Sequence, residues 1–321
     1  MTGSPLLDLL IGLAALILTL AFVGAIYQVI ATRLAEREYP PPGRLVDVGG
    51  YRLHIHCSGP EGASGGPTVI MDAGIGECSL GWGLVQPEIA KFARVCTYDR
   101  AGLGWSDPAP TPRTSRQIVS DLHALLTNAG IGPPYVMVGH SFGGLNARLY
   151  ASQFPEDVAG MVLVNSAHED YPIRLPMLIR IGLLTAPIGI PRLFGLFFVS
   201  ENPIFDRHSR HPSAYRSIAT STRYLNTVRR EWSAAEESWS QARSSKKSLG
   251  DRPLVVLFAR FNHAIFLVLR KLQMELAQRS TKGRLVFVEN SGHHIQHDQP
   301  EVVVEAIREM VEAVRRKTIG V

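Results

Sequence analysis

Short apolar runs alternate with amphipathic segments along most of the chain. Six runs are apolar without the alternation of a half-exposed strand, namely 68–71, 94–98, 135–138, 160–164, 253–258 and 284–288. Unbroken runs of this length are typical of strands buried on both faces of a parallel sheet. Ahead of them, 44–48 and 51–57 flank a Gly-Gly pair, which predicts a β-hairpin.

Amphipathic helices are predicted between these strands. Thr114 and Gln117 form a capping box ahead of an apolar stripe, and Gly130 follows as a stop signal. The last helix is predicted to begin near Pro300 and to end in the basic residues 315–317, which complement the negative end of its dipole. A hairpin followed by strand–helix units indicates an α/β fold, a mainly parallel sheet with helices on both faces.

One long segment interrupts this rhythm. Residues 166–250 contain helical and loop patterns but no strand. Their most apolar part, 175–199, is interrupted by three prolines, which argues against a membrane span. We therefore predict a helical cap over one edge of a core formed by 44–165 and 251–321.

The N-terminus has the composition of a membrane-spanning helix. Residues 6–30 carry a single charge, Asp8, and a helix of this length spans the roughly 30 Å of a bilayer's hydrocarbon core. No basic residue precedes the run, which argues against a cleaved signal peptide. We predict a retained single-pass anchor over 6–30 and a proline-rich linker over 31–43. Arginines in and after the linker favour a cytoplasmic catalytic domain.

Composition and charge narrow the classes of function. Hydrophobic residues make up 45% of the chain and charged residues 19%, which indicates a globular protein with a sizeable core. The net charge of +5 is modest and no dense basic run accompanies it, so nucleic-acid binding is not expected. The three cysteines lack the spacing of a zinc site, and no metal is expected.

The strongest chemical signal is the sequence Gly139-His140-Ser141-Phe142-Gly143. It follows a predicted strand and opens a predicted helix. A serine hydroxyl becomes a useful nucleophile when it is exposed on a sharp turn, beside a base and beside donors for an oxyanion. Ser141 is therefore the candidate nucleophile.

Two backbone N–H groups are candidates for that oxyanion hole. The Phe142 N–H follows the nucleophile directly, and the Ile75 N–H lies in the glycine-containing loop 72–76 after the strand 68–71. The base is expected after the last strand, where 291–294 read Ser-Gly-His-His. From position alone, His293 and His294 are both candidates.

Three segments of this sequence carry a resemblance to a known family: the turn 139–143, called the elbow below, the loop 72–76, and the sequence Asp-Arg-Ala-Gly-Leu-Gly-Trp-Ser at 99–106. The sequence resembles the α/β-hydrolase fold superfamily, in particular its capped esterase, epoxide-hydrolase and dehalogenase branch. The resemblance covers about 44–315. It implies an eight-stranded sheet, a Ser–His–acid triad and no cofactor, and it makes His293 the base because this histidine directly follows glycine. Serine at the elbow, where epoxide hydrolases carry aspartate, points to acyl transfer to water.

The chain departs from the family at the acid. The two positions where the family carries it, after the sixth and the seventh strand, are Asn165 and Asn262. Glu169 and Asp170 are substitutes if their loop folds back. We expect Asn165 to face His293 and to accept its ring N–H, which leaves a weakened triad.

Hydrolysis of a lipophilic carboxylic ester is the function this sequence favours. An amidase or peptidase would use the same machinery, and a weakly active or non-catalytic ligand-binding protein is the rival from another class. Because the fold makes the strands of Cys57 and Cys96 neighbours, a bridge between them is conceivable, but two buried free thiols are expected.

Overall fold

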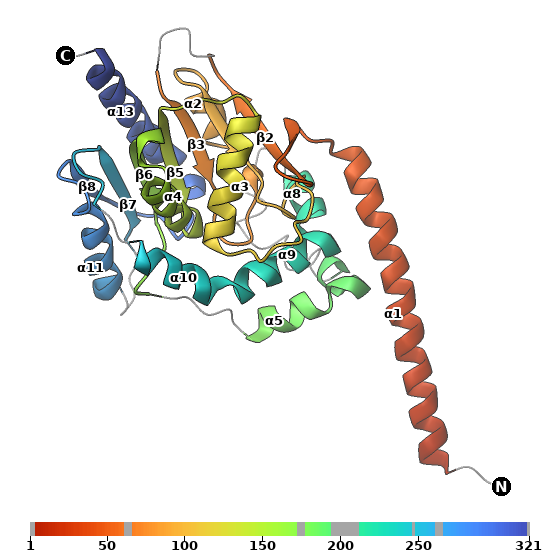
Figure 1. Ribbon diagram of the computed structural model, residues 1–321. Coiled ribbons are helices and arrows are strands. Elements are labelled where there is room, and N and C mark those ends of the chain that lie inside the picture. The colour runs from red at the N-terminus through yellow and green to blue at the C-terminus, as the bar shows by residue number, and fades with distance from the viewer. Residues whose placement is uncertain are drawn as a thin grey trace.

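The computed structural model describes residues 4–60, 66–171, 177–193, 212–245, 248–260 and 266–319. Its centre is an eight-stranded sheet in the order β1-β2-β4-β3-β5-β6-β7-β8, parallel from β4 onward (Figure 1). The strands are β1 Arg44–Asp47, β2 Arg52–Ser58, β3 Thr68–Asp72, β4 Val95–Tyr98, β5 Tyr135–His140, β6 Val158–Val164, β7 Leu254–Ala259 and β8 Gly283–Val288. The predicted hairpin and the six apolar runs match these strands, so the predicted fold class is confirmed.

Helices cover both faces of the sheet because the central strands β3, β5, β6 and β7 present apolar side chains on both sides. One buried cluster joins the sheet to α3 (Ser115–Asn128), α4 (Phe142–Gln153) and α11 (Phe266–Ala277). A second cluster joins the opposite face to α2 (Gln86–Ile89) and α13 (Pro300–Ile319). The Thr114 hydroxyl accepts the Gln117 N–H at the start of α3, as the capping box predicts.

The described part of the segment between β6 and β7 consists of helices joined by loops and contributes no strand to the sheet. Its helices are α5 Met177–Leu184, η3 Ala186–Ile188, α8 Pro212–Ala219, α9 Thr222–Ser233 and α10 Ala235–Ser244. They lie across the end of the sheet at which the parallel strands finish (Figure 1). The Trp239 ring of α10 stacks on Phe142, with ring centroids 5.6 Å apart, so this cap packs directly on the turn that carries Ser141. The remaining short helices are η1 Ser79–Trp82, η2 Pro155–Asp157 and α12 Ile295–Asp298.

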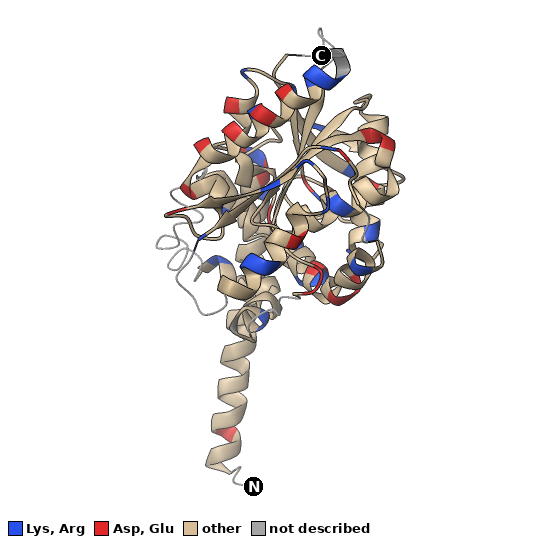
Figure 2. Ribbon diagram, turned by 90° about the vertical axis from the view of Figure 1, so that its left-hand side faces the viewer, with Lys and Arg blue, Asp and Glu red and all other residues tan. Residues whose placement is uncertain are grey.

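The N-terminal helix α1 is longer than predicted. It spans Pro5–Glu38, so most of the predicted linker 31–43 is helical. Residues 31–38 are mainly strong helix formers, and the first residue that disfavours a helix is Pro40. Among the described residues, α1 is the one helix long and apolar enough to cross a membrane. Figure 2 shows it projecting from the domain, with almost no residue of its free length coloured as charged.

A disulfide joins Cys57 to Cys96, which corrects the expectation of two free thiols. The antiparallel register of β2 and β4 places the two residues directly opposite each other, with Cα atoms 4.0 Å apart. The third cysteine, Cys78, is free and buried. Disulfides persist mainly in oxidising compartments, so this bridge counts against the cytoplasmic placement that the arginines favoured.

Candidate active site

Ser141 occupies a strained turn between β5 and α4. Its backbone has φ 50° and ψ −114°, a conformation that L-residues rarely adopt. The turn needs glycine on both sides: a Cβ on Gly139 would lie 2.5 Å from Gly143 backbone atoms, and one on Gly143 would lie 2.2 Å from the Asp72 carbonyl oxygen. The sequence therefore folds into the sharp strand–turn–helix that the glycine spacing predicts.

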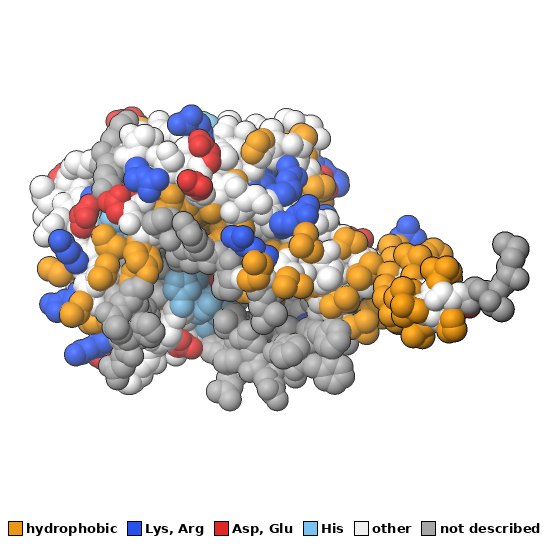
Figure 3. Space-filling model, turned by 90° about the horizontal axis from the view of Figure 1, so that it is seen from below, with side chains coloured by type: hydrophobic (Ala, Val, Ile, Leu, Met, Phe, Trp, Pro, Cys, Tyr) orange, Lys and Arg blue, Asp and Glu red, His pale blue; other side chains and the backbone are white. Residues whose placement is uncertain are grey.

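His293 follows β8 on the same edge of the sheet and contacts Asn165 at the end of β6. The Asn165 Nδ2 lies 2.9 Å from the His293 Nδ1 and donates to the His293 carbonyl oxygen at 3.1 Å. Asn165 itself has φ 43°, a region in which Asn and Asp are the favoured non-glycine residues. Figure 3, which views the molecule from below, shows histidine side chains in a hollow of the surface.

The Asn165 contact decides where the His293 ring carries its proton. A carbonyl oxygen only accepts hydrogen bonds, so the atom facing the His293 carbonyl must be the amide nitrogen. The same nitrogen faces Nδ1, which therefore accepts, and the neutral ring carries its proton on Nε2. We expected Asn165 to accept the ring N–H; it donates instead. This tautomer is the reverse of the one a base needs to take a proton on Nε2.

Burial also keeps the His293 ring neutral. Burial, together with the nearby His140 and His294, lowers the pKa of His293 to about 3, against a smaller opposing effect of Glu77. The residue is exposed in part to solvent, but its ring is surrounded by Asn165, at 2.9 Å, and by the rings of His140 and His294, with centroids 4.9 and 5.2 Å away. A neutral ring is the correct charge state for a base. The same environment makes the imidazolium that would form during proton transfer unfavourable.

Glu77 is a functional candidate that the sequence did not reveal. Its carboxylate accepts from His294 Nε2 at 2.9 Å, from His140 Nδ1 at 3.1 Å and from the Gly74 N–H at 2.9 Å. His140 also donates through Nε2 to the His293 carbonyl oxygen at 3.1 Å. The His140 ring is thus held between the Glu77 carboxylate and the His293 carbonyl oxygen. His294 faces Glu77 while His293 faces Asn165, so the adjacent histidines have different partners.

The two predicted oxyanion donors lie in backbone that other contacts hold in place. The N–H groups on either side of Ile75 are engaged, that of Gly74 by Glu77 and that of Gly76 by Glu231 at 2.8 Å. Within the described ranges we find no hydrogen-bond acceptor for the N–H of Ile75 or of Phe142. The Phe142 N–H belongs to the first residue of α4, where helix geometry leaves it without an internal partner.

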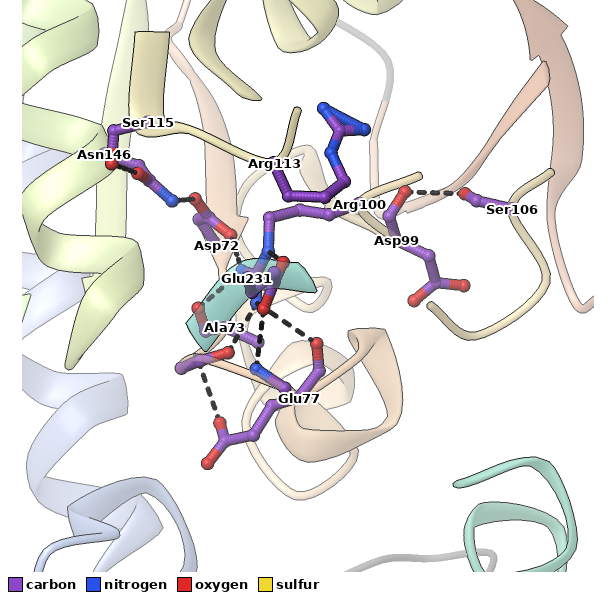
Figure 4. A network of polar contacts seen from close by, with 12 residues as sticks. Asp72, Ala73, Glu77, Asp99, Arg100, Ser106, Arg113, Ser115, Asn146 and Glu231 are labelled. Atoms are coloured by element: carbon purple, nitrogen blue, oxygen red, sulfur yellow. Dashed lines mark hydrogen bonds and ion pairs between the residues drawn. The ribbon is translucent and has the colours of Figure 1, made fainter. Parts of the chain in front are cut away.

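A buried arginine fixes the Ile75 loop to the core and to the cap (Figure 4). Arg100 donates to Asp72 at 2.6 Å, to the carbonyl oxygens of Ala73 and Gly74 at 2.8 and 2.6 Å, and to Glu231 of α9 at 2.7 Å. All three charged side chains are at most 2% exposed. Buried charges that satisfy each other in this way hold a loop in one geometry, because breaking a single contact leaves an unpaired charge.

The other candidates for the acid lie elsewhere. Glu169 is buried against Arg148, at 3.0 Å, and Arg279. Burial raises the pKa of Glu169, but the two arginines outweigh burial and bring it to about 2. Asp170 is exposed and its backbone N–H donates to His168. Neither carboxylate contacts His293 in the part of the chain that is described, and Asn262 lies outside the described residues.

One further cluster has the composition of a metal site. His168, Asp170 and Glu275 place potential ligand atoms within 4.8 Å of one another. The His168 Nδ1 accepts the Asp170 N–H, so the neutral ring carries its proton on Nε2, the nitrogen that faces Glu275. A protonated nitrogen has no lone pair for a cation. The positive charges of Arg148 and Arg279 beside Glu169 oppose a cation as well.

Comparisons with known proteins show the family of this fold. The family model described as "Alpha/beta hydrolase family" matches residues 55–306, so the chain belongs to the alpha/beta hydrolase family. The "AB hydrolase superfamily protein" of Gibberella zeae is 26% identical over 288 residues, which cover 78% of this chain and 87% of that protein.

One further relative matches a shorter part of the chain, and one solved structure matches most of it. The Hormonema carpetanum protein named "Probable transporter efuK" is 39% identical over 138 residues, which span 41% of this chain but only 20% of that protein. The structure of a thermophilic esterase from Thermogutta terrifontis has a TM-score of 0.58 at 20% identity, covering 85% of this chain and 98% of that one. Likeness at this identity supports the fold.

Proposed function

We propose that this hydrolase is a serine esterase that cleaves lipophilic carboxylic esters through an acyl intermediate on Ser141. The observation that carries the proposal is the strained backbone of Ser141 between β5 and α4, on the sheet edge where His293 is also held. Serine at this position supports acyl transfer to water over the chemistry of an aspartate nucleophile. The apolar cap and the apolar α1 support a lipophilic substrate.

In the proposed mechanism, the Ser141 hydroxyl attacks the ester carbonyl carbon while its proton passes to the His293 Nε2. The N–H groups of Ile75 and Phe142 stabilise the oxyanion, and the leaving alcohol takes the proton from Nε2. Water then hydrolyses the acyl-serine by the same steps. The first step requires a free lone pair on Nε2, so the ring must first adopt the tautomer with its proton on Nδ1. Asn165 would then have to turn its amide and give up its bond to the His293 carbonyl, which predicts slow turnover.

The same contact favours one rival function. A protein that holds His293 with its proton on Nε2 has no free lone pair to offer Ser141 and is suited to binding a ligand without cleaving it. Such a protein would bind esters or acids of the same class saturably, with no covalent intermediate.

A covalent probe separates the two functions. Wild-type protein and Ser141→Ala are treated with a fluorophosphonate, and both are assayed on esters of graded acyl length and on matched amides. The proposal expects labelling and ester hydrolysis in the wild type, both lost in a Ser141→Ala variant that keeps the wild-type melting temperature. Saturable ligand binding without labelling of the folded wild type would establish the rival. Faster cleavage of the amides would assign an amidase or peptidase.

We also propose that α1 crosses a bilayer once. Its apolar residues from Leu6 to Ile30 are exposed along the length that projects from the domain, and exposed apolar surface of this extent needs a lipid or protein partner. The helix has the length and hydropathy of a membrane span.

A further inference from the structure

The relative position of α1 and the cap is fixed by close contacts. A Cβ added to Gly24 would lie 2.3 Å from the Ile188 carbonyl oxygen, and Gly189 adopts φ 75° at the same crossing. The buried Gln28 donates to the Thr220 carbonyl oxygen at 2.8 Å. The helix that is proposed to cross the membrane is therefore docked on η3 and α8 and does not lead away on a free linker.

This docking sets the depth of the cap relative to a bilayer. From Pro5 to Gly24, α1 rises about 29 Å at ~1.5 Å per residue, close to the ~30 Å thickness of a hydrocarbon core. Exposed apolar side chains continue beyond Gly24 as far as Leu34, on the sides of α1 that the cap leaves uncovered. A bilayer that covers this longer apolar stretch reaches the level of α5 and η3.

The cap surface at that level has the composition of a membrane interface. Exposed apolar side chains on and after α5 are Met177 (70%), Ile179 (49%), Ile181 (53%), Leu184 (63%) and Leu193 (46%). Figure 3 shows apolar side chains on this face next to the base of α1. Residues 177–193 contain no acidic residue and Arg180 of α5 is exposed, a bias that suits anionic lipid headgroups.

We propose that this face of the cap, formed by the exposed side chains of α5 and the residues up to Leu193, lies in the headgroup and upper acyl region of the bilayer that α1 crosses. The proposal rests on the membrane span proposed for α1. It places the cap at the source of a lipophilic substrate. A monotopic contact of this kind needs few residues because α1 already supplies the attachment.

The test uses full-length protein in vesicles of phosphatidylcholine with phosphatidylglycerol. The native thiols are bridged or buried, so a single introduced cysteine can carry an environment-sensitive fluorophore. One label is placed at Ile181→Cys in the proposed face and one at Leu13→Cys within the span. A third is placed at Thr281→Cys, which is exposed just before β8, at the end of the sheet where the parallel strands begin and away from the cap. Quenching by lipids with a nitroxide on the acyl chain reports contact with the bilayer.

We expect the Leu13 and Ile181 labels to be blue-shifted and quenched and the Thr281 label to be neither. If the Leu13 label is quenched and Ile181 behaves like Thr281, the anchor stands and the docked face is refuted. An unquenched Leu13 label would instead refute the span. A blue shift at Ile181 without quenching would mean that protein covers this face, which also overturns the proposal.

Two glycine variants test whether the close contact between α1 and η3 holds the cap at the membrane. Gly24→Val should separate α1 from η3 and reduce quenching at Ile181, because a side chain at this position clashes with backbone. Gly12→Val lies in the same helix with nothing within 4 Å of its added Cβ, so it should leave quenching unchanged. Equal quenching in both variants would show that the α1 contact does not hold the cap at the membrane.

Discussion

Replacing Asn165 with aspartate should accelerate ester hydrolysis. An Asp carboxylate can only accept, so it would require the His293 tautomer with its proton on Nδ1 and would free Nε2 to act as the base. It would also face the imidazolium formed when Ser141 is deprotonated. The backbone supports the exchange, because aspartate tolerates the φ of 43° found at this position.

The size of the effect follows from two opposing contributions. A carboxylate about 4 Å from the imidazolium charge contributes ~4 kcal/mol at an effective dielectric constant of about 20. The hydrogen bond from Asn165 to the His293 carbonyl is lost, which costs ~1 kcal/mol. The difference of ~3 kcal/mol corresponds to a roughly 10²-fold increase in kcat.

Steady-state hydrolysis of a nitrophenyl ester between pH 5 and 9 measures this change, with Asn165→Ala as the matched control. In the wild type the pKa of His293 is about 3, so ionisation of this ring should not limit kcat/KM within that range. The new carboxylate raises the pKa of the ring, so activity in Asn165→Asp should fall at the acid end of the range. An aspartate variant that folds normally but is no faster than the wild type, with an unchanged pH profile, would refute the role given to Asn165.

The disulfide, the Glu77 site and the Arg100 cluster each give one further prediction. Intact mass after alkylation should show the Cys57–Cys96 bridge in untreated protein and two more alkylated thiols after reduction; free thiols in protein purified without reductant would restore the cytoplasmic placement. The rings of His140 and His294 hold the pKa of Glu77 well below its usual range despite burial, and Glu77 raises the pKa of His294 despite burial. The Glu77–His294 pair therefore stabilises the fold most between the unfolded pKa values of the two groups, about 4.3 and 6.5. Glu77→Gln should lower the free energy of unfolding more at about pH 5.5 than at about pH 8.5. Equal losses at the two pH values would contradict the pairing. Glu231→Gln should lower the free energy of unfolding, measured in urea, by ~3–5 kcal/mol because it leaves part of the buried Arg100 charge unpaired. An exposed ion pair contributes at most ~1 kcal/mol. A loss below ~1 kcal/mol would therefore contradict the structural role of Glu231.

The centre of the sheet was predictable because strands β3 to β7 are buried on both faces, which leaves unbroken apolar runs in the sequence. The elbow was predictable for a similar local reason, since Gly139 and Gly143 stand where any side chain would clash with backbone. Glu77 was missed because its partners lie 63 and 217 residues further along the chain, and only the fold brings them together.

Two other features depended on neighbours that a local pattern does not reveal. The end of α1 was placed too early because its polar last turns resemble a linker until their packing on the cap is known. The bridge between Cys57 and Cys96 was missed because it depends on the register of two strands, which a shift of one residue would destroy. Asn165 was found by its position after β6, but the direction of its hydrogen bond required the His293 carbonyl in view.

The contact between Glu231 and the Ile75 loop bears on how ligands are exchanged. Glu231 belongs to α9 of the cap, yet it holds both the Gly76 N–H and Arg100. Lifting the cap at α9 would strip these groups of their partner, so that end of the cap is suited to act as a fixed hinge. Ligands that reach or leave Ser141 should then pass through another part of the cap, and α9 can be treated as rigid when ligands are docked or specificity is redesigned.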